Sequence, residues 1–220
     1  FISATAIAFD ANDRLFMADE ALHRITIFDA DHNYESHWGT EGSGEGEFDG
    51  PSGIAFDRDG DLLVVDDKNQ RIQRYTPDGK YLNSFGSAGD GDGEFSYPWG
   101  ITVAPDGVIY VADWRNDRIQ RFTHEGKFID VCGASGDGEG QFNRPANVAV
   151  DGDGNIFVAD WGNQILQVFD SNGKFLMSHR GSADLNPWAL EYCEAQQDEK
   201  RARVSYVPIY EPDTDDVREV

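Results

Sequence analysis

The sequence predicts an all-β fold, a β-propeller whose blades are repeated four-stranded units. One pattern recurs in the segments 46–86, 93–133 and 140–180 at a spacing of 47 residues. A fixed period of this length is typical of repeat architectures. Each unit holds four short runs rich in β-branched and aromatic residues, separated by turn sequences. No stretch before residue 190 has the apolar spacing of a helix.

Prolines give the unit boundaries. The period is marked by Pro51, Pro98 and Pro145, and Pro187 follows. The blades are therefore expected at about 4–50, 51–97, 98–144 and 145–186, with a fifth beginning at 187, all within 1–190. The segment 191–220 departs from the pattern and is interpreted as a divergent insertion or C-terminal segment. There we expect a short polar helix over 191–202 and a strand over 204–210.

The strands of one unit can be taken in order along 51–97. The runs 54–56 and 62–65 are nearly all apolar, as expected for strands buried on both faces. The run 72–75 alternates polar and apolar residues, which predicts a half-exposed strand. The run 81–85 completes the unit as the outermost strand. Four strands ordered from the centre outward form a propeller blade.

The motif P-x-G-I-A-F-D…V-V-D-x-x-N-x-R-I-Q resembles the NHL repeat, the blade unit of NHL β-propellers. The resemblance covers about 1–190 and implies an intact form of six blades. We therefore expect the chain to be a portion of a longer protein. An open arc of about four and a half blades would expose strand edges, through which copies could associate as a homo-oligomer.

The resemblance also implies a structural role for the Asp that ends the second strand. This carboxylate is expected to accept N–H groups of the following turn, and the arginine five residues later to pair with it or with a neighbouring blade. The aspartates are Asp19, Asp66, Asp113 and Asp160. Two units depart from the pattern, because Leu22 replaces the asparagine of the others and Ile165 replaces the arginine found at Arg71 and Arg118.

The composition is strongly acidic, with 41 Asp and Glu against 18 Lys and Arg, a net charge of −23. Such a surface repels nucleic-acid backbones and anionic membranes, and it favours cationic ligands or basic proteins. The charge is equally consistent with solubility in a salt-rich habitat. No apolar stretch approaches the roughly 18 residues of a transmembrane helix, so we expect no membrane insertion. The compartment is left open.

The position after the repeat proline lies where inner strands converge on the propeller axis. Amidating lyases with a similar repeat place zinc-binding histidines there, and gluconolactonase-like propellers hold a divalent metal there. In this chain the position holds Thr5, Ser52, Trp99, Ala146 and Trp188. None of these is a strong metal ligand, so no cofactor is expected. Calcium in the acidic loops is the remaining metal alternative, although no complete calcium-loop motif is present.

Aromatic residues mark the same expected face. Trp114 and Trp161 follow the strand-ending Asp, and Trp99 and Trp188 follow the proline. The acidic blade-to-blade loops open on this face, and ring faces with negative potential suit a cation. The alternative is that Trp114 and Trp161 pack between blades and that the loops are solvated connectors.

Three functions remain open from the sequence. The favoured one is a non-catalytic scaffold that binds a cationic small molecule or a basic protein segment through Thr5, Ser52, Ala146 and the four tryptophans. The second is a metal-dependent lyase or hydrolase of the amidating-lyase or gluconolactonase kind, with metal ligands outside the visible blades. The third is a structural, oligomer-forming role. Cys132 and Cys193 are expected to be free, packed thiols.

Overall fold

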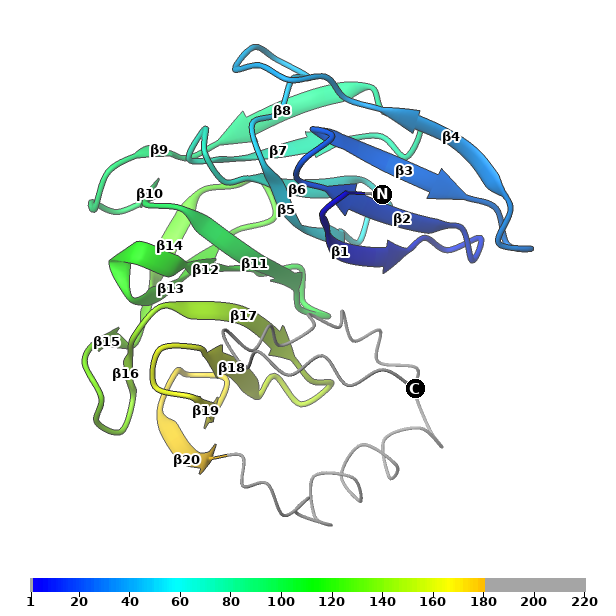
Figure 1. Cartoon of the computed structure of the whole chain (residues 1–220). Helices are drawn as coiled ribbons and strands as arrows, with labels where there is room; N and C mark the ends of the chain where they lie inside the picture. Colours follow the sequence, from blue (N-terminus) through cyan, green and yellow to red (C-terminus); the bar gives the residue numbers. More distant parts are fainter. Residues whose placement is uncertain (1, 181–220) are drawn as a thin grey trace, which may run out of the picture.

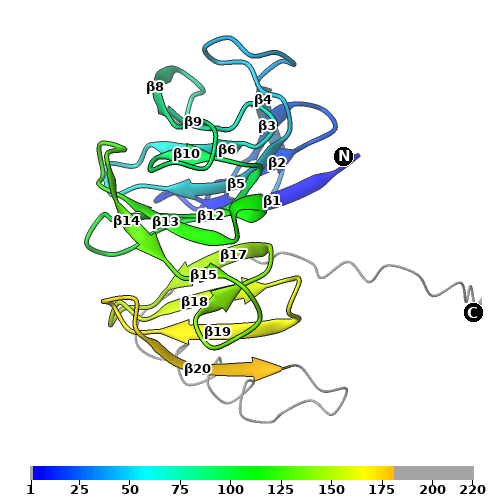
Figure 2. The same ribbon diagram turned by 90° about the vertical axis from the view of Figure 1, so that its left-hand side faces the viewer.

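The computed structural model describes residues 2–180, which form four antiparallel sheets arranged as an arc of propeller blades (Figure 1). The all-β prediction is confirmed, and the only helical element in this range is the 3-10 turn Trp114–Asn116. A view turned by 90° shows the sheets stacked face against face (Figure 2). Trp188, Cys193 and the elements expected after residue 190 lie outside the described residues.

Each blade pairs its strands in sequence order. Blade 1 contains β1 (Ala4–Phe9), β2 (Leu15–Asp19), β3 (Arg24–Phe28) and β4 (Tyr34–Trp38). Blade 2 contains β5 (Pro51–Phe56), β6 (Leu62–Asp66), β7 (Arg71–Tyr75) and β8 (Tyr81–Phe85). Blade 3 contains β11 (Pro98–Val103), β12 (Ile109–Asp113), β13 (Arg118–Phe122) and β14 (Phe128–Cys132). Blade 4 contains β17 (Pro145–Val150), β18 (Ile156–Asp160), β19 (Ile165–Phe169) and β20 (Phe175–Arg180). The inner strands β1, β5, β11 and β17 are neighbours around the arc.

The core lies between blades, and strand periodicity explains why. Successive side chains of a strand point to opposite faces, so Leu62 and Val64 of β6 pack toward blade 1. Leu63 and Val65 of the same strand pack toward blade 3. All four side chains are fully buried. A strand covered on both faces therefore reads as a continuous apolar run, as predicted for 62–65.

The blade-to-blade loops carry short parallel pairings that the sequence did not predict. β9 (Ser87–Ala88) pairs with β10 (Glu94–Phe95), and β15 (Ala134–Ser135) pairs with β16 (Gln141–Phe142). In the first blade-to-blade loop, a single bridge joins Glu41 to Phe48. The phenylalanine of each loop is completely buried between blades: Phe48, Phe95 and Phe142.

The prediction that the third strand is half exposed is wrong. In β7, Gln73 is 0% and Arg74 is 5% exposed. Both side chains stay inside because they have polar partners there. Gln73 bonds to Asp66, and Arg74 forms an ion pair with Asp57 at 2.8 Å. Buried polar groups are tolerated when such partners satisfy them.

Candidate binding face

The inner strands begin and the second strands end on one face of the arc, which also carries the blade-to-blade loops. We call this the loop-bearing face. The loops of this face are held by a buried carboxylate in each of blades 2 and 3, which accepts hydrogen bonds from four groups. In blade 2, Asp66 accepts the N–H of Asp49 at 2.7 Å through one oxygen. Its other oxygen accepts from Asn69 at 2.9 Å, Arg71 Nε at 2.8 Å and Gln73 at 3.0 Å. Burial raises the pKa of the Asp66 carboxyl, and the donors offset that effect only in part.

The same donors bind the blade-to-blade loop. Arg71 donates to the carbonyl oxygens of Gly44 and Glu47 at 2.7 and 3.0 Å, and Gln73 donates to Glu47 at 2.7 Å. Blade 3 repeats this network around Asp113. The expected pairing of the arginine with the aspartate is therefore confirmed. The aspartate's backbone partner in blades 2 to 4, however, belongs to the preceding loop, 17 residues earlier, and not to the following turn.

Blade 4 lacks one donor of this network. Asp160 keeps the N–H of Asn143, the amide of Asn163 and the amide of Gln167. Ile165 stands where the arginine would donate, as the sequence indicated.

The residues after the repeat proline bind one blade to the next. The Thr5 hydroxyl lies 3.0 Å from the carbonyl oxygens of both Pro51 and Ser52 and donates toward them. The Ser52 hydroxyl donates to the Trp99 carbonyl at 3.2 Å and is 1% exposed. The inner strands approach so closely that a Cβ on Gly53 would lie 2.5 Å from the Trp99 oxygen. Thr5 and Ser52 thus have a structural task at the position where sequence reasoning expected ligand contact.

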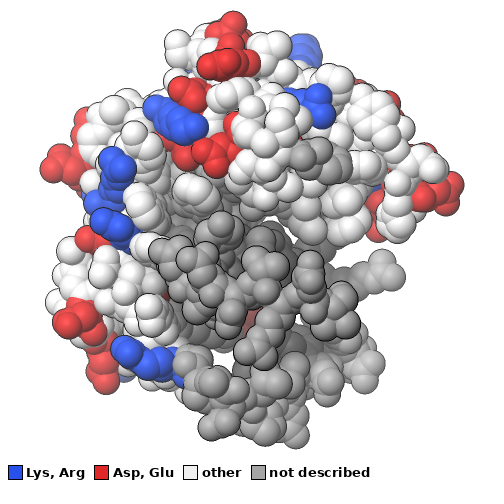
Figure 3. Space-filling view, in the orientation of Figure 1, with Lys and Arg blue, Asp and Glu red and all other residues white. Residues whose placement is uncertain are grey.

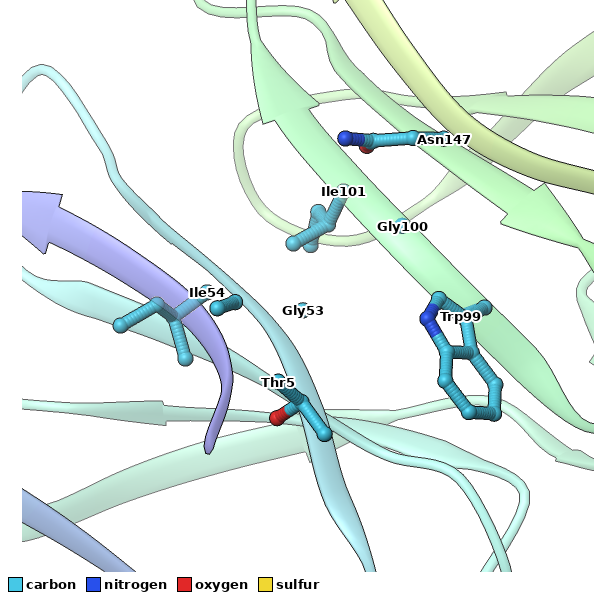
Figure 4. Close-up of a pocket in the computed structure, with 8 residues that line it drawn as sticks. Thr5, Gly53, Ile54, Trp99, Gly100, Ile101 and Asn147 are labelled. Carbon is cyan, nitrogen blue, oxygen red and sulfur yellow. The ribbon is translucent and has the colours of Figure 1, made fainter. Parts of the chain in front are cut away.

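A small cavity lies among these inner strands (Figure 4). Its volume is about 10 Å³, room for one water molecule. It is lined by Thr5, Ala6, Gly53, Ile54, Trp99, Gly100, Ile101 and Asn147. Ala146 is half-buried beside Asn147 and does not line it. In residues 2–180, no three His, Cys, Asp or Glu side chains are grouped to hold a metal ion.

Carboxylates gather over blades 1 and 2 on the loop-bearing face. Lys68 Nζ lies 3.1 Å from Glu20 and 3.8 Å from Asp49. Asp67 is 2% exposed, and its Oδ1 has no hydrogen-bond partner among the described residues. Burial and the Glu20 charge raise the pKa of Asp67 to about 7. We call Glu20, Asp49 and Asp67 the acidic sector. Among the described residues, the Lys68 amino group forms ion pairs with Glu20 and Asp49.

Aromatic and arginine side chains gather over blades 3 and 4. The rings of Trp114 and Trp161 lie 6.3 Å apart at 49°. Arg144 lies over Trp114 at 5.0 Å, and Arg115 lies over Tyr97 at 3.9 Å and over Trp114 at 5.7 Å. We call these five residues the aromatic ladder. The two tryptophans do contact each other across blades, yet Trp161 stays 48% exposed.

The acidic sector and the stacking of arginines in the aromatic ladder were not predicted from the sequence. Aligned unit by unit, Glu20 and Asp67 occupy the same position as Trp114 and Trp161, after the strand-ending Asp. That alignment would have revealed the acidic sector. Nothing in the sequence indicated that Arg115 and Arg144 stack on the rings.

The loop carboxylates divide into two kinds. Glu47 and Glu94 turn inward and accept the N–H groups of Gly44 and Gly91. The exposed ones are Glu41, Glu45, Asp90, Asp92, Asp137 and Glu139. In the view of Figure 3, acidic groups lie mostly toward the outer rim of the arc.

A larger groove of about 370 Å³ lies between blades 3 and 4 on the opposite face. Its lining includes Val108, Tyr110, Arg121, Ile129 and Val150. Arg121 is fully engaged there, since it forms an ion pair with Asp130 and donates to the Ser171 carbonyl. No helix among residues 2–180 is long and apolar enough to cross a membrane.

Two family models match the chain. The NHL repeat matches residues 95–122 and 142–169, and a model described as a 6-bladed beta-propeller matches residues 5–83. No curated protein matches the chain.

Several solved propellers have a similar fold. A catalytically inactive virginiamycin B lyase from Staphylococcus aureus, crystallised with quinupristin, is 18% identical with a TM-score of 0.61, covering 82% of this chain and 56% of its own. A gluconolactonase from Xanthomonas campestris is 20% identical with a TM-score of 0.62, covering 82% and 62%. A Bacteroides thetaiotaomicron protein of unknown function is 19% identical with a TM-score of 0.61, covering 76% and 47%. The chain thus spans about half to three-fifths of these structures, and the likeness shows the fold alone.

Proposed function

Because the chain belongs to the NHL-repeat β-propellers, we propose that it is a non-catalytic scaffold that binds a cationic small molecule or a basic protein segment on its loop-bearing face. The supporting observation is the acidic sector. Two of its carboxylates, Glu20 and Asp49, form ion pairs with the same amino group, that of Lys68. The third, Asp67, is almost fully buried and has an unpartnered oxygen. A buried carboxylate without full compensation gains free energy when a cation approaches.

The sequence led us to expect that the rings of the aromatic ladder bind a cation from outside the protein. The structure favours another role for them. Arg115 and Arg144 already lie over Tyr97 and Trp114. These ring faces therefore have cations of the protein itself. In the acidic sector a single amino group, that of Lys68, faces two carboxylates, so negative charge remains there for a cation from outside.

A binding experiment tests this proposal. A pentalysine peptide and spermidine are titrated calorimetrically into the full chain at about 0.15 M ionic strength, where the Debye length is ~8 Å and distant charges are screened. The double variant Glu20→Gln/Asp49→Asn should weaken binding at least about fivefold, because it removes two charges that contact the cation.

The matched control is Asp78→Asn/Glu125→Gln, which removes two exposed charges from turns on the opposite face. Its affinity should stay within about twofold of the parent protein, since the five-residue strands between the two faces are roughly 17 Å long, more than a Debye length. Equal weakening by both double variants would show that only net charge matters and would refute a defined site.

The alternative is a metal-dependent lyase or hydrolase. Its support is the fold likeness to proteins described as a lyase and a gluconolactonase. Any metal ligands would have to include residues beyond 2–180, because no suitable cluster lies within that range. Metal analysis of the full-length protein tests this candidate: one tightly bound divalent ion per chain would support it and count against the scaffold proposal.

A further inference from the structure

Arg115 and Arg144 differ from the arginines of the blade framework. Arg71 and Arg118 each donate to a buried aspartate at 2.8 Å. Arg115 and Arg144 instead lie over aromatic rings, and among residues 2–180 neither forms an ion pair with a carboxylate. Two guanidinium groups without carboxylate partners are unexpected in a chain with a net charge of −23.

The nearby carboxylate of Asp117 forms no ion pair with either guanidinium group among the described residues. One of its oxygens accepts the backbone N–H of Arg144 at 2.7 Å, and the other accepts the Ser135 hydroxyl at 2.7 Å. Asp117 therefore fixes the backbone before Pro145 and leaves the Arg144 guanidinium over Trp114.

Two ladder residues occupy backbone positions that a glycine would fill without strain. Tyr97 and Arg144 directly precede a repeat proline and have φ of 51° and 55°. Gly50 holds the same place in blade 2, with φ of 75°. Glycine adopts this conformation without strain, whereas a side chain there costs free energy. Both strained positions supply residues of the aromatic ladder.

The chemistry of this arrangement suits an anion with a flat apolar body. A guanidinium stacked face-on over a ring keeps its in-plane N–H groups directed outward, where they can donate two parallel bonds to a carboxylate. Both guanidinium carbons lie within 6 Å of the Trp114 centroid, at 5.7 and 5.0 Å, so one ligand can reach both. The exposed ring of Trp161 offers a stacking surface beside them.

The net negative charge of the chain does not prevent an anion from binding at the aromatic ladder. At physiological ionic strength the Debye length is ~8 Å, so most of the carboxylates of a protein of this size are screened from the ladder. The charges that act on a ligand at the ladder are therefore the near ones, the guanidinium groups of Arg115 and Arg144 and the carboxylate of Asp117.

We propose that the aromatic ladder is a binding site for a planar aromatic carboxylate. The site is independent of the cation-binding function proposed above: it lies over other blades and takes a ligand of opposite charge.

The test uses 2-naphthoate as the probe and the full chain as the protein. Binding is followed by calorimetry and by the NMR signals of the tryptophan indole N–H groups. The expected result is saturable binding that shifts the Trp114 and Trp161 signals. Arg115→Gln and Arg144→Gln should each weaken it at least about tenfold, as expected for loss of a hydrogen-bonded charge. Arg58→Gln, at an exposed arginine in the β5–β6 turn on the opposite face, is the matched control and should leave it unchanged.

Two further variants separate ligand binding from a structural role. Arg144→Lys keeps the charge but loses the planar fork, so it should also weaken binding severalfold. Arg144→Gly relieves the backbone strain, so it should reduce binding without lowering the thermal midpoint by more than about 2 °C. Absence of saturable 2-naphthoate binding would overturn the proposal. So would unchanged affinity in Arg115→Gln and Arg144→Gln, or equal affinity for the cation 2-naphthylmethylammonium.

Discussion

At the scale of single residues, the buried aspartate that ends the second strand is the centre of the polar network in blades 2 and 3. Asp113 accepts the N–H of Ser96, the amides of Asn116 and Gln120 and the guanidinium of Arg118. Both its oxygens are used, and it is 0% exposed. The carboxylate therefore binds the incoming loop, the second strand and the third strand in one network.

Replacing the Asp113 carboxylate should lower the free energy of unfolding strongly. Asp113→Ala leaves Arg118, whose side chain is 12% exposed, without its carboxylate partner and leaves the buried amide of Gln120 with one acceptor fewer. Breaking a buried ion pair costs about 3–5 kcal/mol. Urea unfolding followed by circular dichroism measures this change. Asp137→Ala, an exposed carboxylate of a blade-to-blade loop, is the control and should change stability by less than about 0.5 kcal/mol. A loss below about 1 kcal/mol in Asp113→Ala would contradict the structural role of the network.

Asp67 should make stability depend on pH in the opposite sense to an ordinary ion-paired carboxylate. Burial and Glu20 raise its pKa to about 7, above the value in an unfolded chain. The folded state thus holds the proton more tightly between about pH 4 and 7, and the stability contribution of Asp67 falls as pH rises through that window.

Asp67→Asn removes this ionisation. The variant should be more stable than the parent protein at pH 8, by on the order of 2–4 kcal/mol, and the difference should vanish as pH falls to 4. Urea unfolding of both proteins at pH 4, 6 and 8 measures it. A difference that is constant across this range would show that Asp67 titrates normally.

Part of this residue-level picture could be predicted. The strand-ending aspartates and their arginines were assigned structural roles from the repeated motif, and the structure confirms the pairing of Arg71 with Asp66. The burial of Gln73 could not be foreseen, because its partner Glu47 lies 26 residues away on a loop that only the blade geometry brings close.

At the scale of elements, each blade-to-blade loop depends on one phenylalanine. Phe95 is completely buried and packs 5.5 Å from the ring of Phe122. Gly86, at φ 94°, lies against the Phe95 ring, and a Cβ there would come within 2.4 Å of it. The loop therefore closes over the phenylalanine at a position that requires glycine.

Phe95→Ala should open a cavity between blades 2 and 3 and cost about 3–5 kcal/mol. Thermal unfolding measures this loss. Ser87→Ala, on an exposed residue of the same loop, should leave the midpoint nearly unchanged. Near-native stability of Phe95→Ala would mean that the loop is held by the polar network alone.

Strands were predicted more reliably than loops. Short runs of β-branched and aromatic residues between turn sequences placed the four strands of the unit 51–97, and the spacing of 47 residues extended them to the other units. These signals are local in the sequence. The parallel pairing of β9 with β10 was missed, since its two-residue strands carry no pattern of their own. The exposure of β7 was mispredicted because polar residues in a strand can be buried when they meet partners from a neighbouring loop.

At the scale of the whole molecule, the loop-bearing face is divided along the arc. The acidic sector lies over blades 1 and 2, and the aromatic ladder lies over blades 3 and 4. The repeat explains the division, because equivalent positions carry Glu20 and Asp67 on one side and Trp114 and Trp161 on the other. The same blade backbone thus carries acidic side chains over blades 1 and 2 and aromatic side chains over blades 3 and 4.

Hydrogen–deuterium exchange of the full chain, with and without saturating pentalysine, tests the central claim most directly. If the acidic sector binds the cation, protection should increase in segments 17–24, 47–52 and 65–70 and stay unchanged in the opposite turns at 57–61 and 76–80. Protection confined to those opposite turns, or no change anywhere at saturation, would contradict binding on the loop-bearing face.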